Sequence, residues 1–120
     1  WAKLDAGTED YYKLVERTTI PYQRVLDNLL LAGRKRPIVI QSLFMRVNGQ
    51  PPSAEEIAAT IDRLRGLTTA GCQIKLVQVY TIARETAEAY VAPLANDEVD
   101  AIVCRVRSIG LSCEGFYGPT

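Results

Sequence analysis

Polar side chains stand at or near the carboxyl ends of several apolar runs, and their types could do chemistry. They are Lys3, Asp5, Gln41, Ser42, Gln78, Tyr80 and Arg84. Polar groups in such runs need hydrogen-bond partners, because an unpaired buried amide or hydroxyl costs roughly 1–3 kcal/mol. A bound polar molecule would supply those partners. These residues are therefore candidates for contact with a polar ligand.

Neighbouring side chains offer a second explanation for several of these residues. Gln41 and Gln78 would also be satisfied by a hydrogen bond to each other across adjacent strands. Lys3 and Asp5 would form a local ion pair. Tyr80 would be a core aromatic residue with its hydroxyl at the edge of the core. The sequence leaves both explanations open.

Arginines follow two of the apolar runs. Arg46 and Arg84 are either solvated loop residues or groups that hold a carboxylate or phosphate, for which the guanidinium is suited. We favour the second role for Arg84. The run 34–36 (Arg-Lys-Arg) is expected at the opposite edge of the sheet, as a solvated turn.

Several kinds of catalytic site cannot be assembled from these residues. The 120 residues contain no histidine, which excludes a histidine-based triad or a histidine metal site within this chain. Cys72, Cys104 and Cys113 are odd in number, and their spacing matches no common zinc or cluster motif. No nucleophile–base pair or glycine-rich phosphate loop is visible. We therefore assign no catalytic and no metal-binding residue within this chain.

One pattern recurs three times: an amphipathic helix, a glycine, and then an apolar run rich in β-branched residues. The glycines are Gly33, Gly71 and Gly110, which we expect to end the helices. A short strand and a short helix precede these units. The predicted strands are 1–5, 37–45, 74–82 and 111–117, and the predicted helices begin near residues 9, 21, 53 and 96.

Two of the predicted helices have recognisable amino-terminal signals. Ser53 and Glu56 predict a capping box, in which each side chain accepts from the other residue's backbone N–H. Asn96 is the expected N-cap of the last helix, with Asp97 and Glu98 in its first turn.

Alternating strands and helices predict an α/β fold in which parallel strands are joined by right-handed crossovers. A complete (β/α) barrel needs about 250 residues. We therefore expect residues 1–120 to form a single partial domain, half of a TIM-like barrel. Its outer strands would expose unpaired backbone groups, which favours self-association through the sheet edges.

The composition of the chain limits the kinds of partner and the location that we expect. Fourteen basic residues balance fourteen acidic ones, so there is no general electrostatic footprint for nucleic acid. No stretch approaches the roughly 18 apolar residues that predict a membrane span. Unpaired cysteines favour the reducing cytoplasm.

Three strings resemble the later strands of radical S-adenosylmethionine proteins, and they are most similar to bacterial iron–sulfur oxidoreductases grouped with wyosine-type tRNA-modifying enzymes. The strings are KLDAG at 3–7, QSLFM at 41–45 and VQVYTIAR at 77–84. The resemblance covers essentially the whole chain. It implies a partial or full (β/α) barrel, of which this chain would be the C-terminal half.

The resemblance also implies a function for the parent protein. A [4Fe-4S] cluster would cleave S-adenosylmethionine to a 5′-deoxyadenosyl radical, which abstracts hydrogen from a substrate. By position, Lys3 and Asp5 would contact the methionine portion or the substrate. Gln41 and Ser42 would face the ribose. Gln78, Tyr80 and Arg84 would line the adenine side or the substrate cavity.

The chain departs from the family at its defining motif. Radical S-adenosylmethionine proteins carry C-x3-C-x2-C after the first strand, and nothing here matches it. The cofactors would therefore belong to the parent protein, with none bound tightly by this chain alone. Two other classes remain open: a non-catalytic α/β binding or interaction module, and another barrel enzyme such as an aldolase. An aldolase needs a lysine at a strand end, and the strand lysines here are Lys3 and Lys75.

Overall fold

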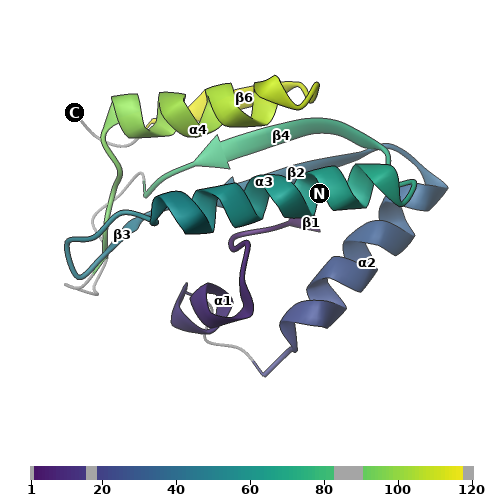
Figure 1. Cartoon of the computed structure of the whole chain (residues 1–120), viewed down its shortest axis with the longest axis horizontal. Coiled ribbons are helices and arrows are strands. Elements are labelled where there is room, and N and C mark those ends of the chain that lie inside the picture. The colour runs from purple at the N-terminus through teal and green to yellow at the C-terminus, as the bar shows by residue number, and fades with distance from the viewer. Residues whose placement is uncertain (1, 16–18, 83–90, 118–120) are drawn as a thin grey trace.

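The computed structural model describes residues 2–15, 19–82 and 91–117. Four parallel strands form the main sheet, in the order β1 (Ala2–Lys3), β2 (Ile38–Leu43), β4 (Ile74–Tyr80) and β6 (Cys113–Phe116). The predicted α/β class with parallel strands is therefore confirmed. β1 and β6 are the two outer strands of this sheet (Figure 1).

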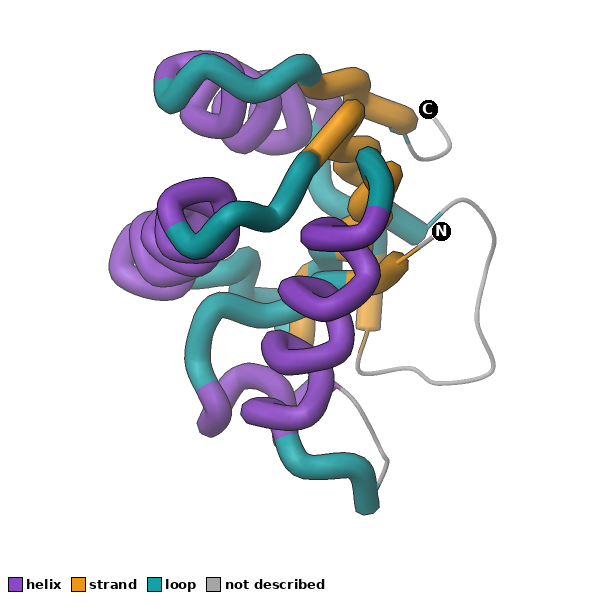
Figure 2. Tube along the Cα trace, turned by 90° about the vertical axis from the view of Figure 1, so that its right-hand side faces the viewer, coloured by secondary structure: helices purple, strands orange, loops and turns teal. Residues whose placement is uncertain are grey.

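The helices lie together on one side of the main sheet, as Figure 2 shows. They are α1 (Glu9–Val15), α2 (Tyr22–Lys35), α3 (Ala54–Thr69) and α4 (Asn96–Ser108). Strand order follows chain order, so the crossovers step in the same direction, and crossovers of one hand place their helices on the same side. None of these helices is long and apolar enough to cross a bilayer.

Side chains of the main sheet alternate between two environments, as a pleated strand requires. The closed face packs against the helices and includes Ile40 and Ser42 on β2 and Val77 and Val79 on β4, which are all buried. The open face carries Val39, Gln41, Leu43, Leu76, Gln78 and Tyr80, and no described helix covers it. The hydrophobic core thus fills the space between the closed face and the helices.

Two short strands form a second, antiparallel pair that the sequence did not reveal. β3 (Arg46–Val47) pairs with β5 (Val91–Ala92), and so joins the segment after β2 to the segment before α4. Asn48 and Gly49 both have positive φ angles and form the tight turn expected of an Asn-Gly pair.

Gly33 does not end its helix, contrary to the prediction. Helix α2 continues through it to Lys35. A Cβ atom at Gly33 would lie 2.1 Å from the Sγ of Cys72, so this glycine permits α2 to approach the turn after α3. Gly71 and Gly110 follow α3 and α4 with positive φ angles, as predicted.

The run 34–36 is not the solvated turn that was predicted, because Arg34 and Lys35 are the last residues of α2 and Arg36 is its C-cap. Arg34 donates from Nε and Nη2 to the carbonyl oxygen of Ala70, at 3.1 and 2.9 Å. Its guanidinium thus satisfies a carbonyl at the carboxyl end of α3, where a positive charge is also favourable.

Candidate functional site

A row of polar residues crosses the open face of the main sheet. Lys3, Gln41, Gln78 and Glu114 are successive register partners on β1, β2, β4 and β6. Register partners in a parallel sheet point to the same face, so these four residues form one line, which we call the polar row. All four lie within two residues of a strand's carboxyl end, where α/β proteins bind ligands.

Hydrogen bonds join the middle of the polar row to Tyr80. The Nε2 of Gln41 donates to the Oε1 of Gln78 at 3.2 Å and lies 3.4 Å from the Tyr80 hydroxyl, which itself donates to Gln78 Oε1 at 3.1 Å. The expected cross-strand bond between Gln41 and Gln78 is therefore present. It occupies one acceptor of Gln78 and leaves the amide nitrogen of Gln78 and the amide oxygen of Gln41 for a ligand.

Apolar and aromatic groups stand next to the polar row, one step closer to the strand ends. Tyr80 and Phe116 are register partners, and their rings stack with centroids 4.5 Å apart and planes 9° from parallel. Leu43 is the partner of Tyr80 on the other side. A depression of about 320 Å³ lies here, lined by Lys3, Gln41, Leu43, Tyr80 and Thr81.

Asp5 connects the ends of β1 and β2 beside this depression. Its carboxylate is buried and accepts from the backbone N–H of Leu43 at 2.8 Å. The ammonium group of Lys3 lies 3.3 Å from the other carboxylate oxygen, so the expected local ion pair is present. The Lys3 side chain is 63% exposed, and it can reach a ligand without a large loss of existing contacts.

The structure does not bring all the predicted site residues together. Ser42 lies on the closed face, 1% exposed and among residues of α3 and α4, because neighbouring residues of a strand face opposite sides. The open-face ligand site therefore does not include it. Arg84 lies outside the described residues.

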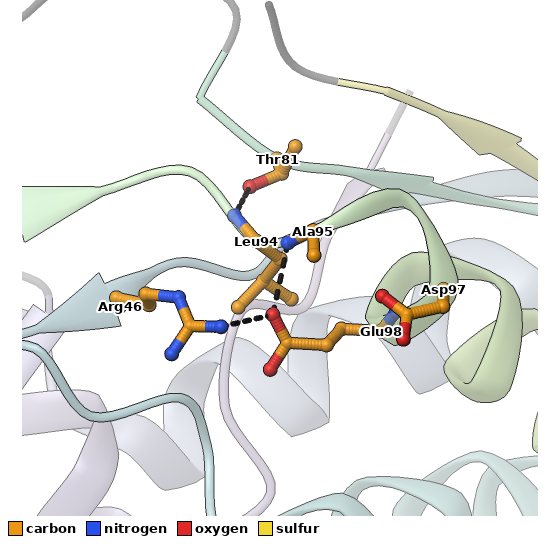
Figure 3. A network of polar contacts seen from close by, with 6 residues as sticks. All are labelled: Arg46, Thr81, Leu94, Ala95, Asp97 and Glu98. Atoms are coloured by element: carbon orange, nitrogen blue, oxygen red, sulfur yellow. Dashed lines mark hydrogen bonds and ion pairs between the residues drawn. The ribbon is translucent and has the colours of Figure 1, made fainter. Parts of the chain in front are cut away.

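Arg46 belongs to a separate polar network beside the strand ends (Figure 3). Its guanidinium pairs with the carboxylate of Glu98, which also accepts from the backbone N–H of Ala95 at 2.9 Å. The hydroxyl of Thr81 accepts from the N–H of Leu94 at 2.7 Å. Arg46 is therefore engaged within the protein. These contacts tie the segment that precedes α4, and its first turn, to β3 and to the residue that follows β4.

Ala95, and not Asn96, is the N-cap of α4, and Asn96 is its first helical residue. The carboxylate of Glu98, three residues later, accepts a hydrogen bond from the backbone N–H of Ala95. The helix therefore begins one residue earlier than predicted, and Glu98 lies in its first turn as expected.

The three cysteines lie on different elements. Cys72 is buried in the turn after α3, where it contacts Gly33 of α2. Cys104 is exposed on α4, and Cys113 is buried at the start of β6. Burial raises the pKa of the Cys113 thiol to about 11, and it raises the pKa of Cys72 as well. Within the described ranges, no three acidic, cysteine or histidine residues gather closely enough to hold a metal ion.

The open face therefore suits one of the two implied cofactors better than the other. Amides, a hydroxyl and an ammonium group can hold the ribose and amino-acid portions of S-adenosylmethionine through hydrogen bonds and charge. Cysteines on three separate elements do not fit an iron–sulfur cluster, which needs several thiolates at one place. Neither the family models nor the curated proteins include a match to this chain.

Proposed function

We propose that this chain is the C-terminal part of a radical S-adenosylmethionine barrel, and that its open face binds S-adenosylmethionine or the substrate. The observation that carries the proposal is the polar row, joined to Tyr80 beside a depression at the strand ends. The strings KLDAG, QSLFM and VQVYTIAR, which resemble this family, supply part of that row and its surroundings.

The shape of the sheet supports a barrel. In a (β/α) barrel the strands run in chain order, the helices cover the outside, and the other face of the sheet forms the interior. The main sheet has this order, with its helices on one side. A polar row on the opposite face would then point into the barrel, where a ligand is shielded from water.

The polar residues have distinct tasks in this proposal. Gln41 and Gln78 orient the ligand, because each amide offers both a donor and an acceptor. Lys3 holds a carboxylate by charge, and Asp5 keeps β1 and β2 in register through its bond to Leu43, which lines the depression. S-adenosylmethionine supplies the radical when it is bound to a reduced cluster, and the cysteines for that cluster would come from the rest of the parent protein.

The parent protein provides the first test. We expect the coding sequence upstream of Trp1 to contain C-x3-C-x2-C. We also expect the full-length protein, reconstituted with iron and sulfide under anaerobic conditions, to absorb as a [4Fe-4S] protein. With reductant and S-adenosylmethionine it should form 5′-deoxyadenosine. An upstream sequence without the motif would contradict the proposal at once.

A binding module without catalysis is the second candidate. One observation favours it: the amides of Gln41 and Gln78, in the middle of the polar row, donate and accept hydrogen bonds but do not act as acids or bases. Such a module would bind its ligand and release it unchanged. The same reconstitution experiment separates the two candidates, because only the radical enzyme forms 5′-deoxyadenosine.

We further propose a cytoplasmic location. The described cysteines are free thiols, and one of them, Cys104, is exposed on α4. An exposed free thiol is better suited to a reducing compartment. Fractionation of cells that express the full-length protein should recover it in the cytoplasmic fraction, and secretion into an oxidising compartment would contradict this location.

A further inference from the structure

Glu56 is a buried carboxylate that serves a segment other than its own helix. It is the third residue of α3 and only 5% exposed. Its carboxylate accepts from the backbone N–H of Gly7 and, at 2.6 Å, from the hydroxyl of Thr8. Both donors lie in the loop that follows β1, about fifty residues earlier in the chain.

The capping box predicted for α3 is only half formed, and Glu56 is the reason. Ser53 does cap the helix, since its Oγ accepts from the N–H of Glu56 at 3.0 Å. The returning bond, from the Ser53 N–H to the glutamate, is replaced by the bonds to Gly7 and Thr8. In α4, by contrast, Glu98 at the equivalent position does accept from the N–H of its own N-cap residue. Glu56 therefore bonds to the loop after β1 and not to its own N-cap residue.

The loop after β1 makes further close contacts with α3. A Cβ atom at Gly7 would lie 2.2 Å from the backbone nitrogen of Thr60, so the loop backbone touches the helix backbone directly. Arg63 donates from Nε to the carbonyl oxygen of Gly7 at 3.2 Å. Burial raises the pKa of the nearby Tyr11 hydroxyl, and the negative charge of Glu56 raises it further.

This loop leads directly to the candidate site. Leu4 donates its N–H to the carbonyl oxygen of Gln41 at 2.9 Å, and Asp5 accepts from the N–H of Leu43. Only one residue, Ala6, separates Asp5 from Gly7. A loop that is fixed at Gly7 and Thr8 therefore has little freedom to move Asp5.

We propose that Glu56 is a positioning residue for the open-face site, which holds the loop after β1 so that Asp5 stays bonded to Leu43 beside the depression. A charged acceptor suits this task, because hydrogen bonds to an ionised carboxylate are roughly twice as strong as those between neutral groups. The part of this inference that concerns ligand binding rests on the function proposed above. The part that concerns the loop does not.

The test compares Glu56→Gln with Glu55→Gln. Glu55 is exposed in the same helical turn, so its replacement removes the same charge without touching the loop. Amide hydrogen exchange, followed by NMR on the whole chain, reports on the loop directly. Titration calorimetry with S-adenosylmethionine reports on the site.

In Glu56→Gln we expect the Gly7 and Leu43 amides to exchange about tenfold faster, as the loss of one charge-assisted bond predicts. The Val77 amide, which donates to Ser112 within the main sheet, should exchange at its original rate. The Kd for S-adenosylmethionine should rise about tenfold. Glu55→Gln should change none of these values.

Unchanged exchange at Leu43 in Glu56→Gln would overturn the inference, even if Gly7 exchanged faster. A wild-type chain without even weak binding of S-adenosylmethionine would instead contradict the assignment of the open face to this cofactor, and the exchange rates would still decide the role of Glu56. Should Glu56→Gln fail to fold, Thr8→Val removes one donor to the same carboxylate and should accelerate exchange at Leu43 to a smaller extent.

Discussion

The two faces of the main sheet differ in how they use neighbouring residues of the same strands. On β2, Ile40 faces the helices and is fully buried, while Gln41 beside it faces the open side and bonds to Gln78. On β4, Val79 is buried against α3 and α4, while Tyr80 borders the depression. The comparison teaches that the closed face accounts for stability, and the open face is available for binding. Each of the following substitutions tests one side of that division.

The largest effect is expected on the closed side of the molecule. Leu64 in α3 is 1% exposed and packs in the core, so Leu64→Ala should lower the free energy of unfolding by about 2–5 kcal/mol. Chemical denaturation followed by circular dichroism measures this loss. Leu31→Ala is the matched control, because Leu31 is 58% exposed and its replacement should cost less than about 0.5 kcal/mol.

A smaller loss is expected where α2 meets the turn after α3. Gly33→Ala would place a methyl group 2.1 Å from the Sγ of Cys72, and such overpacking costs about 1–3 kcal/mol. Gly66→Ala is the control, because a Cβ atom there meets nothing within 4 Å, and it should stabilise α3 by about 0.5–1 kcal/mol. Adding Cys72→Ala to Gly33→Ala should restore part of the loss. An unchanged free energy of unfolding in Gly33→Ala would contradict the close contact between α2 and Cys72.

We expect replacement of Ser42 to change stability and to leave ligand binding unchanged. Its hydroxyl is buried on the closed face and has no hydrogen-bond partner among the described residues, so Ser42→Ala removes an unsatisfied group and should raise the free energy of unfolding by about 1 kcal/mol. Ligand affinity should stay at the wild-type value. A loss of affinity in this variant would indicate that the closed face reaches the site after all.

The cysteines give the smallest effect at neutral pH, where only their reactivity differs. The Cys113 thiol lies on the closed side and its pKa is raised to about 11, so it stays protonated at pH 8 and should not react with a thiol reagent in the folded state. Exposed Cys104 should react. A folded-state pKa above the unfolded one also means that stability from Cys113 is complete below about pH 9 and is lost as the pH rises towards 11. Cys113→Ser should lack this loss when unfolding is measured across that range.

Local patterns predicted the elements well. Helix 9–15 and the helix capped by Ser53 both occur as expected, because apolar spacing and caps are properties of neighbouring residues. The strands also lie where predicted, although each is shorter at its ends. Side chains alternate between the two faces along a strand, so the sequence already implied that Ser42 and Gln41, as neighbours, face opposite sides of the sheet.

Contacts between distant residues could not be predicted in the same way. The diversion of Glu56 to Gly7 and the pairing of β3 with β5 depend on how separate segments approach in space. Gly33 had the residue type of a helix terminator, and only the proximity of Cys72 explains its place inside α2. The bond between Gln41 and Gln78 was predicted as an alternative, because it needs only the register of adjacent strands.

Binding of S-adenosylmethionine to the whole chain tests the central claim most directly. Titration calorimetry of the wild type, Gln41→Ala and Gln73→Ala compares a glutamine in the polar row with an exposed glutamine at the opposite edge of the same sheet. We predict weak but measurable binding by the wild type and by Gln73→Ala, and an affinity at least about tenfold weaker for Gln41→Ala, with all three proteins folded during the titration. Equal affinities for Gln41→Ala and Gln73→Ala, or no binding by the wild type, would contradict the assignment of the open face as the ligand site.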